Sequence, residues 1–238
     1  MRRELVVIAA ALLGVLLTGG LGLWQLDRAA QKLERQAALD ARIALPPLEA
    51  RSLARDPAAA ASQQYRRVAL HGRWLPERTV FLDNRPLEGR VGFVVVTPMA
   101  LDDGKVVLVQ RGWLPRNFGE RTALAEVATP SGRVDVVGTV ALRPPRLFEF
   151  SSASSGAIRQ NLDLPSFARE TGLDLLPLLV VQQDSPGGLT DGLVRRTVPP
   201  ANDVQKHHGY AFQWFALAAV IIVLYVWHRL IRPRYRRT

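Results

Sequence analysis

Four residues near the C-terminal end of the chain have types and a spacing suited to holding a flat aromatic cofactor. His207, Tyr210, Ala211 and Trp214 occupy positions i, i+3, i+4 and i+7, which lie on one face of an α-helix. A single histidine can serve as an axial haem ligand, and aromatic rings beside a gap left by alanine would suit a porphyrin. His208 points about 100° away from His207, so the two imidazoles cannot chelate one metal without distortion. The alternative is an interfacial histidine with ordinary aromatic anchors.

Other residues that could do chemistry are few. His71 is the only histidine between residues 25 and 206, and it could act as a general base or be an ordinary turn residue. Residues 83–85 (DNR) could bind an anion or form an internal ion pair. The adjacent Asp102 and Asp103 fit a hairpin turn better than a pair of acid–base groups. The motifs of serine hydrolases, P-loop proteins and zinc proteases are absent, so we expect a protein that is not an enzyme.

Composition excludes further classes of site. The chain has no Cys, which rules out disulfides, thiol nucleophiles and Cys-ligated zinc or iron–sulfur centres. With only two Met, delivery of copper by thioether ligands is disfavoured. The net charge of +10 is concentrated at the two ends of the chain, whereas nucleic-acid binding needs a basic stripe on the folded domain. No nucleic-acid partner is expected.

Two uncharged apolar runs predict membrane spans. Residues 5–24 could cross roughly 30 Å of hydrocarbon as a helix, and residues 209–227 form a second run with aromatic residues at both ends. The first run could be a signal peptide, but it is long and no A-x-A cleavage site follows. The basic residues outside both runs predict cytoplasmic termini. The predicted organisation is therefore cytoplasmic residues 1–4, spans at 5–24 and 207–228, a periplasmic domain at 25–206, and a cytoplasmic tail at 229–238.

The first span carries a stripe of small residues. Ala10, Gly14, Thr18 and Gly22 recur at every fourth position, the pattern that lets two membrane helices approach closely. The stripe predicts packing against the second span, although chance enrichment of small residues is an equal alternative.

The segment between the spans predicts a mainly antiparallel β domain with some helix. Residues 25–42 should continue the first helix until residues 45–48 (LPPL) end it. The residues 102–104 (DDG) predict a hairpin turn, with residues 93–96 and 106–109 as its buried arms. Residues 165–171 predict a short helix that Asp163 caps and Gly172 stops. Further strands are expected at residues 66–74, 79–84, 92–101, 105–113, 133–142, 178–182 and 194–198.

Several stretches together resemble the surfeit locus protein one family. They are residues 21–28 (LGLWQLDR), 81–85 (FLDNR), 89–98 (GRVGFVVVTP), 108–115 (LVQRGWLP) and 207–215 (HHGYAFQWF). The resemblance covers nearly the whole chain, both spans included. Gln110 stands where many relatives have Asn. The resemblance implies that Gly92 and residues 111–113 have structural roles, because glycine permits close backbone approach or positive φ.

The resemblance also implies a function, because the family comprises assembly factors for haem-copper cytochrome c oxidase. Members have been proposed to hold haem a and deliver it to oxidase subunit one. The family's H-x-x-Y pattern falls on His207 and Tyr210, so His207 becomes the candidate haem-iron ligand, with Tyr210 and Trp214 beside it and His208 as second choice. The implied partners are subunit one, the haem a synthesis machinery and membrane lipid, in the cell inner membrane. Two alternatives stay open, namely a scaffold that never touches haem and a membrane-tethered hydrolase that uses His71.

Overall fold

The computed structural model describes residues 2–116, 127–147, 156–184, 191–195 and 204–231. The chain divides into two compact units, one formed by Met1–Leu39 together with Val198–Thr238 and the other by Asp40–Thr197. We call the first the helix pair and the second the barrel unit. The described elements are, in chain order, α1 (Arg2–Ala44), β1 (Leu48–Glu49), η1 (Ala50–Ser52), α2 (Pro57–Gln63), β2 (Arg67–Trp74), η2 (Pro76–Arg78), β3 (Val80–Leu87), β4 (Arg90–Leu101), β5 (Val106–Pro115), β6 (Arg133–Ala141), β7 (Ile158–Arg159), α3 (Leu164–Thr171), β8 (Leu175–Gln182), α4 (Val204–Val226) and the π-helical turn η3 (Trp227–Ile231).

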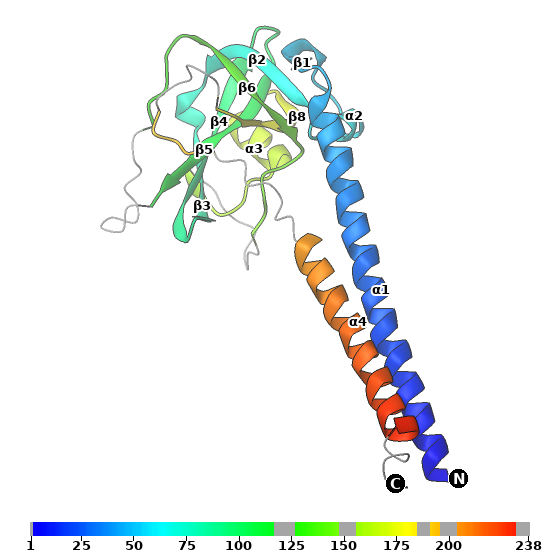
Figure 1. Ribbon diagram of the computed structural model, residues 1–238. Helices are drawn as coiled ribbons and strands as arrows, with labels where there is room; N and C mark the ends of the chain where they lie inside the picture. Colours follow the sequence, from blue (N-terminus) through cyan, green and yellow to red (C-terminus); the bar gives the residue numbers. More distant parts are fainter. Residues whose placement is uncertain (1, 117–126, 148–155, 185–190, 196–203, 232–238) are drawn as a thin grey trace. The chain divides into compact units, whose positions relative to one another are not determined.

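The helix pair is antiparallel. Glu4 near the start of α1 pairs with Arg229 just after α4, whereas Gln25 of α1 contacts His207 near the start of α4. Both helices are long and apolar enough to cross a membrane. Figure 1 shows α1 as one continuous blue helix beside the orange α4. The expected polar extension at residues 25–42 is therefore part of the same helix, which ends before Pro46 and Pro47 because proline cannot continue it.

Glycines of the small-residue stripe lie against α4, as the stripe predicts. A Cβ at Gly22 would come within 2.7 Å of the Phe215 ring, and one at Gly14 would lie 3.2 Å from Ile221. The Thr18 hydroxyl donates to the Gly14 carbonyl at 2.7 Å and so satisfies itself within α1. In a lipid bilayer no hydrophobic force drives helices together, so close van der Waals packing at small residues stabilises their association.

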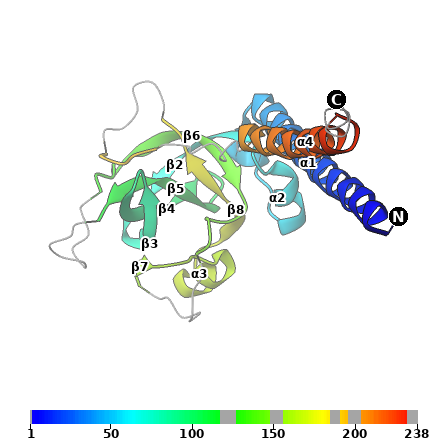
Figure 2. The same cartoon turned by 60° about the horizontal axis from the view of Figure 1, so that its bottom comes forward.

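The barrel unit is built around a closed ring of five strands. The ring runs β2–β6–β8–β5–β4 and closes where β4 pairs with β2, at Trp74↔Met99 and Gly72↔Leu101. All of its pairings are antiparallel except β5 with β8. The mainly antiparallel α+β character agrees with the sequence prediction, but the closure was not predicted. Figure 2 shows the strands curling around one another, with α3 at the side.

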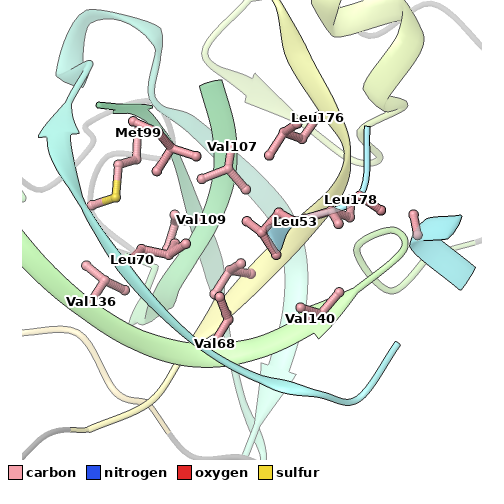
Figure 3. Close-up of a cluster of buried hydrophobic side chains, with 14 of the residues drawn as sticks. Leu53, Val68, Leu70, Met99, Val107, Val109, Val136, Val140, Leu176 and Leu178 are labelled. Carbon is pink, nitrogen blue, oxygen red and sulfur yellow. The ribbon is translucent and has the colours of Figure 1, made fainter. Parts of the chain in front are cut away.

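The core fills the inside of this ring. Figure 3 shows side chains from several strands pointing into one space, with Leu53 of the connector after α1 among them. Its buried members include Val68, Leu70, Val107 and Leu178. Burial alternates along β2 and β6, because every second side chain of a strand faces the interior of the ring. The sequence predicts no secondary structure for the connector at residues 51–62. It contains most of α2, whose Ala60 is buried.

The hairpin turn and the short helix occur where the local signals place them. Gly104 has φ +80°, as a tight turn after two aspartates requires. The α3 helix has Asp163 as its N-cap and Gly172 in the left-handed conformation at its end. The predicted arms are confirmed: residues 93–96 lie in β4 and residues 106–109 in β5, all buried except the half-buried Val94. Within the hairpin, residues 106–109 pair with residues 97–100, and residues 93–96 pair with residues 110–114. The short turn ends at residue 105, so the arms nearest the turn must pair first.

Strands β1, β3 and β7 extend the sheet beyond the ring. β3 pairs with the long β4, and the two-residue β7 pairs with β3 in parallel. The strand predicted at residues 194–198 is represented by Val194 alone, which forms one antiparallel bridge with Trp113. Residues 196–198 of that predicted strand lie outside the described residues.

Candidate functional site

His207 lies where α4 begins, and its partner comes from α1. Its Nδ1 is 2.7 Å from Oε1 of Gln25, across 182 residues of sequence, and both side chains are half-buried. Gln25 directly follows the apolar run of residues 5–24. Its contact with His207 places the Gln25 amide beside the start of α4. We call this contact and its surroundings the histidine end of the helix pair. Sequence reasoning missed Gln25 as a partner, although residue 25 is within one of the quoted motifs.

The aromatic residues proposed to flank His207 differ in exposure. Tyr210 is 49% exposed, whereas Trp214 is half-buried. Ala211 is buried, one turn before Phe215 whose ring lies against Gly22, so the predicted gap beside the aromatic rings is wrong. The contact with Gln25 engages Nδ1 of His207 alone, so among the described residues its second ring nitrogen is open to a ligand. His208 is exposed.

The opposite end of the helix pair carries an ion pair and a hollow. Arg229 donates from two nitrogens to the two carboxylate oxygens of Glu4, at 3.0 and 3.1 Å. A hollow of about 590 Å³ is lined mainly by apolar side chains of α1 and α4, including Val7 and Leu224, with His228 at its border. Ala10, the member of the small-residue stripe nearest the N-terminus, is exposed and lines this hollow.

The barrel unit contains a buried charge cluster that sequence reasoning missed. Arg111 of β5 is fully buried and donates to Asp191 at 2.9 Å, and Arg195 pairs with the same carboxylate. Arg111 also donates to Thr129 and lies with its Cζ 4.9 Å from the centre of the Trp74 ring. Burial lowers the pKa of Arg111, and Asp191 acts against that shift. An arginine inside an apolar strand is the signal that could have found it, since a buried charge requires a partner.

The motif residues around Arg111 have structural roles. A Cβ at Gly92 would lie 2.2 Å from the Leu114 carbonyl oxygen and 2.5 Å from the Trp113 ring, so only glycine fits there. The Trp113 indole donates to the Arg85 carbonyl at 2.8 Å. The question raised by residues 83–85 is resolved in favour of internal contacts. Asp83 pairs with Arg116, and the buried Arg85 donates to the Gln160 carbonyl at 2.6 Å.

His71 forms a pair with Asp135, at 2.6 Å from its Nδ1. Both side chains are well exposed, at 55% and 80%. A hollow of about 390 Å³ beside His71 is lined by Glu49, Ala50, Arg51, Leu101, Asp102 and Asp103. None of these lining residues carries a hydroxyl, thiol or amine group, and the acid–base side chains at the hollow are His71 and three carboxylates.

The described residues hold no group of three or more His, Asp or Glu side chains able to bind a metal ion. In that part of the chain, no side chains are grouped as the shared protein ligands of a resident metal centre would be.

Comparisons with known proteins place the chain in a family. Residues 12–219 match the model of the SURF1 family. The chain is 25% identical over 240 residues to a SURF1-like protein of Rickettsia bellii, covering 98% of this chain and 94% of that protein. It is 28% identical over 229 residues to Surfeit locus protein 1 of Rattus norvegicus and 28% over 230 residues to that of Homo sapiens, in each case covering 88% of this chain and 71% or 72% of the relative. With its two apolar helices, its barrel and its motifs all inside or adjoining the matched region, the chain belongs to the SURF1 family.

Proposed function

We propose that the chain is a membrane-anchored assembly factor for haem-copper cytochrome c oxidase, which holds haem a on its way to oxidase subunit one. The observation that carries the proposal is His207, a motif histidine at the end of two apolar helices, with Nδ1 held by Gln25 and the other ring nitrogen available. A single imidazole ligand suits a carrier, because one bond must break for the cargo to leave.

The helix pair supports the proposed membrane arrangement. Because α1 and α4 are antiparallel, Arg2, Arg3 and Arg229 belong to the same end as both termini. Basic residues beside a span favour the cytoplasm, so the barrel unit and the histidine end belong outside the inner membrane. The chain has no native Cys, which makes this simple to test. In intact cells, an impermeant maleimide should label Ser131→Cys and spare Thr238→Cys, and the reverse pattern would overturn the orientation.

Three residues would contact the haem. His207 would bind the iron, the half-buried Trp214 would offer its ring, and the exposed Tyr210 would combine an apolar ring with a hydroxyl suited to a membrane interface. The haem itself carries the redox chemistry, which is used only after transfer to the oxidase. The barrel unit, with its buried charge cluster, would supply a rigid surface for docking on the oxidase.

The test is an absorption spectrum of the purified, detergent-solubilised protein after co-expression with haem a synthesis enzymes. Wild type should show a haem a band, His207→Ala should lose or shift it, and His208→Ala should keep it. A band retained in His207→Ala but lost in His208→Ala would move the ligand to His208. No band in wild type, despite a proven haem a supply, would reject haem carriage and favour a scaffold that stabilises an oxidase intermediate.

A further inference from the structure

We infer that Gln25 is a positioning residue for His207. The Gln25 side chain fixes the tautomer of the His207 imidazole and thereby decides which ring nitrogen can bind a ligand. The inference about iron rests on the proposed function. The inference about the tautomer does not, because it concerns only the two side chains present in the chain.

The argument begins with the hydrogen bond. Oε1 of Gln25 is an acceptor, and it lies 2.7 Å from Nδ1 of His207. A neutral imidazole carries one N–H and one lone pair, so the nitrogen facing an acceptor must carry the hydrogen. Nδ1 is then the protonated nitrogen, and the lone pair is on Nε2. Among the described residues Nε2 accepts no hydrogen bond, so its lone pair is available to an incoming ligand.

The type of partner suits this role. A carboxylate at residue 25 would favour the imidazolium, whose two N–H groups leave no lone pair for a metal. The amide oxygen of Gln25 accepts a hydrogen bond without adding charge at the end of an apolar helix pair. Metal-binding histidines commonly donate their second ring nitrogen to an acceptor in this way, and loss of that acceptor typically costs 10–100-fold in affinity.

Gln25 also distinguishes between two adjacent histidines. His207 and His208 differ by about 100° around α4, so only one of them can meet the α1 glutamine. His207 is half-buried at the contact, and His208 is exposed. The choice of ligand between two neighbouring imidazoles is therefore made by a residue of the other helix.

The experiment reads the tautomer directly in the full-length, haem-free protein. The chain is labelled with ¹⁵N at histidine, and long-range ¹H–¹⁵N spectra report which ring nitrogen carries the hydrogen, with the His207 signals assigned by their loss in His207→Ala. Wild type should show His207 protonated on Nδ1. Gln25→Leu should shift the hydrogen to Nε2, the usual site of a free imidazole, while Gln25→Glu should keep Nδ1 protonated. Gln213→Leu, at an exposed glutamine of α4, is the matched control and should leave His207 unchanged.

A titration of the same four proteins with haem a provides the second readout. Gln25→Leu should bind about 10–100-fold more weakly than wild type, and Gln213→Leu should match wild type. An unchanged His207 tautomer in Gln25→Leu would overturn the inference. An altered tautomer with unchanged haem affinity, in a protein that loses haem on His207→Ala, would overturn the role in iron binding. An altered tautomer in a protein that binds no haem a would uphold the positioning of His207 and reject the proposed function instead.

Discussion

The barrel unit and the helix pair keep their polar contacts in different places. In the barrel unit, Arg111 and Asp191 are joined in the interior, with side-chain exposures of 0% and 2%. In the helix pair, the polar contacts of α1 with α4 and with the η3 turn that follows it lie near the two ends, at Gln25–His207 and Glu4–Arg229. Between them, glycines lie against apolar side chains of α4.

The difference separates rigidity from access. A charge cluster inside a barrel cannot exchange partners without exposing a bare charge to an apolar interior, so it fixes one arrangement of strands and loops. A half-buried hydrogen bond at the end of two helices can be reached from outside and opened at small cost. The barrel unit is therefore the part expected to hold its shape, and the histidine end is the part expected to change partners.

The largest expected effect is obtained by removing the carboxylate shared by two buried arginines. Asp191→Asn removes the carboxylate that pairs with Arg111 and the nearer of the two that face Arg195, and the loss of one member of a buried ion pair costs about 3–5 kcal/mol. For a chain of this size the midpoint of thermal unfolding should fall by about 6–20 °C. The measurement is circular dichroism of the detergent-solubilised full chain during heating.

Asp184→Asn is the matched control, because Asp184 also faces Arg195, at 3.6 Å, but is 75% exposed. An exposed pair contributes about 0–1 kcal/mol, so its midpoint should stay within a few degrees of wild type. An equal fall in the unfolding midpoint of the two variants would contradict the contrast between a barrel unit stabilised by buried charge and a helix pair stabilised by packing.

A smaller effect is expected from overpacking the helix pair. Gly22→Leu places side-chain atoms where a Cβ alone would lie 2.7 Å from the Phe215 ring, and such overpacking costs about 1–3 kcal/mol. Spin labels on Leu23→Cys and Phe212→Cys, both exposed, should report a longer and broader distance between α1 and α4. Gly20→Leu is the control, since nothing lies within 4 Å of a Cβ there. Indistinguishable distances in the two variants would show that close approach at Gly22 is dispensable.

The smallest effect concerns pH. Glu170 accepts two hydrogen bonds from Arg159, both of 3.0 Å, and these lower the pKa of its carboxyl below 4.5. Because the folded-state pKa is lowered, the stabilisation is present above about pH 4.5 and is lost as pH falls through the folded value. Glu170→Gln should therefore reduce the acid sensitivity of the barrel unit, measured by urea unfolding from pH 6 to pH 3. Glu77→Gln should retain the wild-type slope, and a slope unchanged in Glu170→Gln would remove this pair as a source of acid sensitivity.

The local elements could be predicted from the sequence because their signals are local. The α3 helix has its cap and its stop within ten residues, and the hairpin turn carries its own glycine. The barrel closure could not be predicted in this way. Closure depends on pairs such as Val106↔Leu175 and Trp74↔Met99, which join strands far apart in the sequence. The pattern of apolar residues along a strand indicates that it is buried, but not which strand lies beside it.

The candidate site was half predictable for a similar reason. His207 was identified from its residue type, its helix face and its motif. Gln25 was not, because an isolated polar residue at the end of an apolar run has no sequence feature that names its partner. The expected gap at Ala211 was wrong because helix periodicity shows which residues share a face, while the partner helix determines which part of that face is covered.

The two helices of the pair lie at opposite ends of the described sequence, so they are synthesised at different times. Gln25 and His207 are 182 residues apart, so at typical rates of translation roughly 10–40 s separate their emergence from the ribosome. Throughout that interval the glycine face of α1 has no α4 to pack against, while the strands of the barrel are made. The contact between Gln25 and His207 therefore cannot form until the barrel has been translated, so it is among the last contacts to become possible during synthesis.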